Sequence, residues 1–148
     1  MQIVIRTATL DDIDTLFAIR TSVVQNHLSR EQMTALGITP LGLAQSIREA
    51  TCVWIAEVEG QPAAFSMVDL DAGEVFAMFV LPAYEGRGLG RRLMAVAEAA
   101  LFEHHDTLYL ITDGRDSIRA NGFYQRLGWS VVDRVDGDDV RYEKSRAR

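Results

Sequence analysis

A glycine-rich loop between an apolar segment and an amphipathic one constrains this chain most. Residues 74–81 are nearly all apolar, residues 82–88 form a polar loop, and residues 89–102 carry apolar side chains at helical spacing. A continuous apolar run is typical of a buried strand, so we expect residues 74–81 to be buried on both faces of a sheet. The segment therefore predicts a strand, a tight loop and a helix in direct succession.

The composition of the loop predicts that it binds an anion. Glycine permits positive φ and lets a ligand approach the backbone closely, and a helix N-terminus adds N–H donors and partial positive charge. Successive N–H groups that converge in this way suit the oxygens of a pyrophosphate. The glycines stand at positions 86, 88 and 90, and arginines stand at 87, 91 and 92.

Two common phosphate-binding loops are excluded by spacing. A dinucleotide fingerprint requires Gly-x-Gly-x-x-Gly, but the third position is Arg91 when counted from Gly86 and Leu93 when counted from Gly88. A nucleotide P-loop ends in Gly-Lys-Ser/Thr, and the only lysine of the chain is Lys144. A plain strand-to-helix turn is the simpler alternative, but the three alternating glycines and three arginines favour an anion site.

The rest of the chain predicts one domain, residues 1–148, of mixed α/β class. The expected order is β-α-α-β-β-β-α-β-α-β-β, which places helices on both faces of a twisted mixed sheet. Residues 26–39 are expected to form a loop or a broken helix. The remaining strands are predicted at residues 3–5, 52–58, 63–68, 108–111, 131–135 and 140–142, and the remaining helices after Thr9, after Pro40 and over residues 117–127.

Charge and composition argue against several partners. The net charge of −6 disfavours nucleic acid, and no apolar stretch reaches the roughly 18 residues of a membrane span. The N-terminus shows no export signal and Cys52 is the sole cysteine, so we expect a cytoplasmic protein. His104 and His105 have no further ligands at metal-binding spacing, which predicts no metal.

Two segments resemble the GCN5-related N-acetyltransferase (GNAT) family. The family motif Gln/Arg-x-x-Gly-x-Gly/Ala is similar to residues 85–90, with Val-Leu-Pro before it, and residues 120–129 resemble a second family segment on a later helix. Glu85 stands where the family has Gln or Arg. A carboxylate facing a pyrophosphate would be repelled, so we expect Glu85 to face solvent or to pair with an arginine.

The resemblance implies acetyl-CoA as the acyl donor. Backbone groups of Phe79 and Val80 would then bind the pantetheine arm and the acetyl carbonyl, and Ser117 would stand where the family often has an asparagine. The implied binding residues are Met78, Phe79, Val80, Gly86, Arg87, Gly88, Leu89, Gly90, Arg91 and Ser117.

The resemblance also implies catalytic roles. Tyr124 occupies the position of the family's general acid, which protonates the CoA thiolate as it leaves; its alternative is a packing residue on an amphipathic helix. Glu74 lies eleven residues before Glu85, where some members keep a glutamate base. The alternative is that Glu74 is a strand-edge carboxylate in water. A water chain would then act as the base.

The implied function is transfer of an acetyl group from acetyl-CoA to a primary amine of a small molecule, peptide or protein. A CoA-binding sensor or scaffold without turnover is the alternative from another class, and hydrolysis or transfer of a longer acyl chain also stays open. The hairpin of residues 131–142 and its strand edge are a candidate homodimer surface, as in many relatives.

Overall fold

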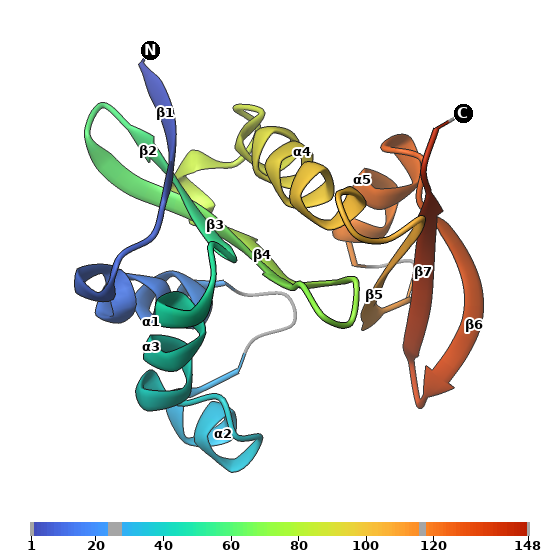
Figure 1. The fold of residues 1–148 in the computed structure, drawn as a ribbon, viewed down its shortest axis with the longest axis horizontal. Helices are drawn as coiled ribbons and strands as arrows, with labels where there is room; N and C mark the ends of the chain where they lie inside the picture. The colour runs from blue at the N-terminus through green and yellow to red at the C-terminus, as the bar shows by residue number, and fades with distance from the viewer. Residues whose placement is uncertain (1, 24–27, 116–117, 148) are drawn as a thin grey trace.

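The computed structural model describes residues 2–23, 28–115 and 118–147 (Figure 1). Within them, a seven-stranded sheet is combined with α-helices and two 3₁₀ turns. The strands are β1 (Ile3–Thr7), β2 (Val53–Val58), β3 (Gln61–Asp69), β4 (Glu74–Val80), β5 (Thr107–Asp113), β6 (Ser130–Asp136) and β7 (Asp139–Ser145). The helices are α1 (Ile13–Ser22), α2 (Arg30–Ala35), α3 (Pro40–Glu49), α4 (Leu89–Phe102) and α5 (Ala120–Arg126), with 3₁₀ turns η1 (Leu10–Asp12) and η2 (Pro82–Tyr84).

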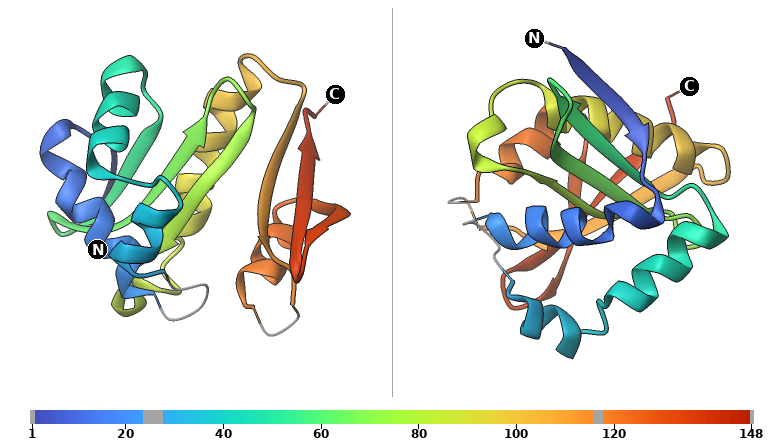
Figure 2. Two further views of the ribbon diagram at one scale, coloured as in Figure 1. Left: turned by 90° about the horizontal axis from the view of Figure 1, so that it is seen from below. Right: turned by 90° about the vertical axis from the view of Figure 1, so that its left-hand side faces the viewer.

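The predicted mixed sheet is confirmed. Its strand order is β1-β2-β3-β4-β5-β7-β6, and the β4–β5 pairing is parallel while the other pairings are antiparallel. Helices α1 and α3 cover one face of β2–β4 and α4 covers the other (Figure 2). The short helix α2 lies in the segment expected to be a loop or a broken helix. No helix in the described chain is long and apolar enough to cross a membrane.

Helix α4 joins the glycine loop to the core. Its bounds agree with the predicted residues 89–102, and its apolar stripe lies on β2, β3 and β4. Burial of such a stripe supplies most of a helix's stability in a folded domain. The fully buried side chains are Leu89, Leu93, Met94, Ala97 and Leu101.

The prediction that residues 74–81 are buried on both faces is wrong. Only Val75 of β4 is buried, and Phe76 is 48% exposed. The physical reason is the short pairing with β5: the register joins Glu74 to Tyr109 and no further residue pair of these two fully described strands. Beyond that point the strands separate, so apolar residues of β4 face an open space instead of a neighbouring strand.

A buried carboxylate holds the 3₁₀ turn η1, which leads directly into α1. Asp12 is 8% exposed, and its two oxygens accept hydrogen bonds from the Arg6 guanidinium, each at 2.9 Å. One oxygen also accepts from the Thr9 backbone N–H at 2.7 Å, which closes a capping box. The Arg6 hydrogen bonds hold the pKa of Asp12 below its usual value.

We predict that Asp12→Ala lowers the free energy of unfolding by about 2–3 kcal/mol at pH 7, because hydrogen bonds to a charged group are lost. A carboxyl with a lowered folded pKa stabilises the fold above its ordinary value of 3.8, and this contribution disappears as the pH falls through the lower folded value. Urea unfolding should therefore show the gap between wild type and variant shrinking below pH 3.8.

Asp14→Ala is the matched control. Asp14 lies two residues later, in α1, but its side chain is 96% exposed and its Oδ1 lies 3.9 Å from the Arg30 guanidinium. Loss of such a surface pair should change the unfolding free energy by less than about 0.5 kcal/mol. Equal effects of the two substitutions would refute the role assigned to Asp12.

Candidate functional site

The separation of β4 from β5 opens a cavity of about 1520 Å³. Its walls come from α1–α3 on one side, from β3, β4 and β5 in the middle, and from the glycine loop, the first turn of α4 and α5 on the other. Segments far apart in the sequence therefore share one space. The cavity is large enough for a ligand of cofactor size.

The glycine loop presents unpaired backbone donors to this cavity. Gly86 and Gly88 have φ of 76° and 80°, and Gly88 is the N-cap of α4. In the described chain, the N–H groups of five residues in the loop and the first turn of α4 donate to no protein acceptor: Gly86, Gly88, Leu89, Gly90 and Arg91. The same five residues line the cavity. The donors, the positive φ and the helix N-terminus fit the oxygens of a pyrophosphate.

Gly90 is needed for close packing, and not for a positive φ as at Gly86 and Gly88. A Cβ atom there would lie 3.3 Å from the Phe123 ring and 3.6 Å from the Met78 methyl group. The absence of a side chain lets the first turn of α4 pack against α5 and β4 at once. Gly90 thus ties the loop to the two elements that carry the other candidate site residues.

The three loop arginines differ in position. Arg91 lines the cavity, whereas neither Arg87 nor Arg92 is among its described lining residues. Arg87 lies over the Tyr84 ring, 5.2 Å from the ring centroid. Of the three, Arg91 is therefore the arginine that the fold directs to the cavity.

Glu85 pairs with an arginine, as expected. Its Oε2 lies 2.8 Å from a guanidinium nitrogen of Arg119, just before α5. This ion pair offsets the carboxylate charge beside the loop. Sequence spacing gave no sign of Arg119 as the partner, because the two residues meet only through the fold.

Strand β4 gives the cavity its middle wall. Met78, Phe79 and Val80 all line it, and on the other side β4 is paired with β3. Arg20 of α1, which was not predicted from the sequence, also lines the cavity and places its guanidinium 4.1 Å from the Phe79 ring centroid. Burial lowers the pKa of Arg20. Its spacing showed only a residue near the end of an amphipathic helix.

Tyr124 of α5 faces the same cavity and is 8% exposed. Its ring contacts those of Phe123 and Tyr142, with centroid distances of 5.7 Å and 5.4 Å. Burial, together with Tyr142, raises the pKa of Tyr124 to about 12. The phenol is therefore a neutral proton donor at physiological pH.

Glu74 is placed differently from Tyr124. It begins β4 beside β5 and is not among the described residues that line the cavity. Burial and the negative charge of Asp69 raise the pKa of Glu74, while a hydrogen bond with Tyr109 and the charge of Arg141 act in the opposite direction. Ser117 lies outside the described residues.

Metal-binding side chains do not gather at this site. Among the described residues, no group of three or more His, Cys, Asp or Glu side chains is arranged to hold a metal ion. The site combines backbone donors, Arg91 and Arg20, the open edge of β4 and the Tyr124 phenol.

Comparisons with known proteins agree with this geometry. The family model of the acetyltransferase (GNAT) domain matches residues 49–131, which is more than half of the chain. An uncharacterized N-acetyltransferase of Archaeoglobus fulgidus is 30% identical over 86 residues. That match covers 52% of this chain and 58% of the relative, so it spans little more than half of the relative's length.

Solved structures share the fold over nearly the whole chain. PaiA N-acetyltransferase from Thermoplasma acidophilum, in complex with coenzyme A, gives a TM-score of 0.82 at 20% identity, with 99% of this chain and 100% of that chain covered. Ribosomal-protein-alanine N-acetyltransferase from Brucella melitensis gives 0.76 at 22% identity, with 96% and 99% covered. Together with the family match, these findings show that the chain belongs to the GNAT family of N-acetyltransferases, which are acyltransferases.

Proposed function

We propose that this protein transfers an acetyl group from acetyl-CoA to a primary amine by direct attack. The observation that carries the proposal is one cavity lined both by the unpaired amides at the start of α4 and by the Tyr124 phenol. The amides suit the diphosphate of CoA, and the phenol suits its leaving thiolate.

The diphosphate would bind at the loop of residues 86–91. Gly86 and Gly88 let the backbone turn its N–H groups toward the ligand, and Arg91 adds a full positive charge. Arg87 lies on Tyr84 outside the cavity lining, so we assign it a smaller share of the binding energy than Arg91. The Glu85–Arg119 pair keeps the neighbouring carboxylate from repelling the phosphates.

The pantetheine arm would run along the open edge of β4. Because β4 leaves β5 after Glu74, its backbone groups on that side have no neighbouring strand near Met78, Phe79 and Val80. An extended ligand with amide groups can pair with such an edge as an added strand does. An N–H group aimed at the thioester oxygen would also stabilise the developing oxyanion, a term often worth about 3 kcal/mol.

In the chemical step, the amine nitrogen attacks the thioester carbonyl carbon and the C–S bond breaks with its electron pair on sulfur. The Tyr124 hydroxyl gives its proton to that sulfur, so free CoA thiol leaves. The proton lost by the attacking nitrogen restores the phenol. A phenol with a pKa of about 12 is protonated at the start of each turnover at neutral pH.

Glu74 is our candidate for taking the proton of an ammonium acceptor before attack. Its raised pKa brings it closer to that of an effective base. Because it does not line the cavity, it would act through water. The same position suits a water chain as the base, with Glu74 at its far end.

We predict that Arg91→Ala weakens CoA binding by about 1–3 kcal/mol, because a charged contact with the diphosphate is lost. Isothermal titration calorimetry of CoA measures this directly. Arg92→Ala is the matched control, since Arg92 is the next residue and is exposed outside the cavity lining. Equal affinities of the two variants would contradict the proposed diphosphate site.

We predict that Tyr124→Phe slows turnover by roughly 100-fold and leaves CoA affinity near that of the wild type, because only the proton donor is removed. Thiol release from acetyl-CoA with a panel of primary amines gives the rate. A fully active variant would remove Tyr124 from the mechanism.

The same assay separates the proposed enzyme from a CoA-binding module. Wild-type protein that binds CoA but releases no thiol across the amine panel would favour the sensor or scaffold. A comparison of acetyl-, propionyl- and succinyl-CoA in this assay tests the choice of acyl group.

A further inference from the structure

We propose that Asn121 and Tyr142 form a positioning pair that holds the Tyr124 phenol at the cavity wall and thereby sets the rate of proton donation. This inference rests on the proposed role of Tyr124 and adds two residues to the machinery. Neither residue lines the cavity, so both would act through Tyr124.

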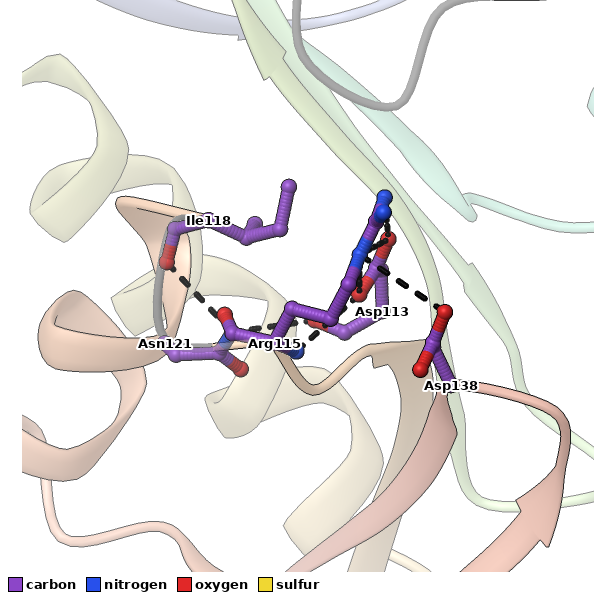
Figure 3. A network of polar contacts seen from close by, with 5 residues as sticks. All are labelled: Asp113, Arg115, Ile118, Asn121 and Asp138. Carbon is purple, nitrogen blue, oxygen red and sulfur yellow. Dashed lines mark hydrogen bonds and ion pairs between the residues drawn. The ribbon is translucent and has the colours of Figure 1, made fainter.

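Asn121 joins the first turn of α5 to the end of β5 (Figure 3). Its Nδ2 lies 3.0 Å from the Asp113 carbonyl oxygen, 2.9 Å from that of Arg115 and 3.4 Å from that of Ile118. An amide nitrogen has two hydrogens, and here they serve three backbone acceptors. Asn121 is 7% exposed, so loss of its side chain would remove these hydrogen bonds from a buried position. The carbonyls of Arg115 and Ile118 would then keep only their backbone donors, the N–H groups of Ile118 and Asn121.

Helix α5 needs this anchor. It has seven residues, its N-cap Arg119 is in the αR conformation, and no side chain caps its N-terminus. A helix of this length is not stable by itself, so its position depends on tertiary contacts. At its N-terminal end, Asn121 supplies those contacts to the loop after β5.

The neighbouring loop residues are themselves held in place. The Arg115 guanidinium lies 2.6 Å from an Asp113 oxygen and 3.8 Å from Asp138 in the β6–β7 turn (Figure 3). Hydrogen bonds from Arg115 lower the pKa of Asp113. The carbonyls that accept from Asn121 therefore belong to a loop tied to both β5 and the C-terminal hairpin.

Tyr142, the second residue of the pair, lies in β7 of the sheet. Its hydroxyl donates to Asn121 Oδ1 at 2.8 Å and accepts from Gln125 Nε2 at 3.4 Å. Tyr142 is 1% exposed and lies opposite Leu110 in the β5–β7 register. Its ring is thus fixed by the sheet on one side and by Asn121 on the other.

The Tyr124 ring packs against the Tyr142 ring. Tyr124 follows Asn121 by three residues, so the two side chains share one face of α5. The rings of Tyr124 and Tyr142 are 5.4 Å apart at 57°. A shift of about 1 Å in a reacting group can cost up to roughly 100-fold in rate, so support behind Tyr124 bears directly on proton transfer.

The test is Tyr142→Phe in two backgrounds. In otherwise wild-type protein we expect kcat to fall about 3- to 10-fold with KM for acetyl-CoA unchanged, because the ring remains but its bond to Asn121 is lost. In the Tyr124→Phe background we expect no further fall, since the effect passes through Tyr124. Equal losses in both backgrounds, or an unchanged kcat in the first, would overturn the pair.

Two further variants separate positioning from general stability. Asn121→Asp keeps an acceptor for Tyr142 but removes the amide donor, and we expect the same pattern of lowered kcat. Ser66→Ala removes another buried hydrogen bond, from Ser66 Oγ of β3 to the Leu93 carbonyl of α4 at 3.3 Å. It should lower Tm and leave kcat unchanged; a kcat loss matching that of Tyr142→Phe would indicate a merely structural effect.

A readout without turnover distinguishes this inference from the proposed function. The chain has four tyrosines, so ¹³C-labelled tyrosine gives few NMR signals, which single Tyr→Phe variants assign. The Tyr124 signal should move in Tyr142→Phe and stay in Ser66→Ala. If the Tyr124 signal moves in Tyr142→Phe but the wild type shows no turnover, the positioning pair is supported and the proposed function is contradicted. If the Tyr124 signal does not move in Tyr142→Phe, the positioning pair is overturned.

Discussion

The early parting of β4 and β5 is the constraint on which the site depends. The two strands share one register pair, Glu74 with Tyr109, and then separate. This leaves an apolar strand with an open edge, a cavity between the two halves of the sheet, and room for the start of α4 and the face of α5 to meet there. If β4 and β5 were paired along their whole length, β4 would be buried and the site would be lost.

The glycine loop presents backbone donors to this cavity, which side chains alone could not provide. Its donors are backbone N–H groups, which are fixed by the fold and carry the partial charge of the helix N-terminus. Positive φ at Gly86 and Gly88 permits that arrangement, and the missing side chain of Gly90 permits the close packing beneath it. The only carboxylate in the loop, Glu85, is paired with Arg119.

The features that depend on local sequence pattern were the ones that could be predicted from the sequence. Periodicity set the bounds of α4, glycine spacing marked the loop, and the resemblance brought in Tyr124, which the structure places at the cavity. The burial of β4 was predicted wrongly because apolar content does not show whether a neighbouring strand is present. The Glu85–Arg119 pair and the contacts of Asn121 were also hidden, since they join residues whose proximity is decided by the packing of α5.

The most direct test of the central claim follows the loop amides during CoA binding. The chain has eleven glycines, so a spectrum of ¹⁵N-glycine-labelled protein is simple enough to assign. On titration with CoA, the signals of Gly86, Gly88 and Gly90 should shift and saturate together. The signal of Gly60 in the β2–β3 turn, which is not among the described residues that line the cavity, should stay in place. Loop signals that do not move at saturating CoA would contradict the account.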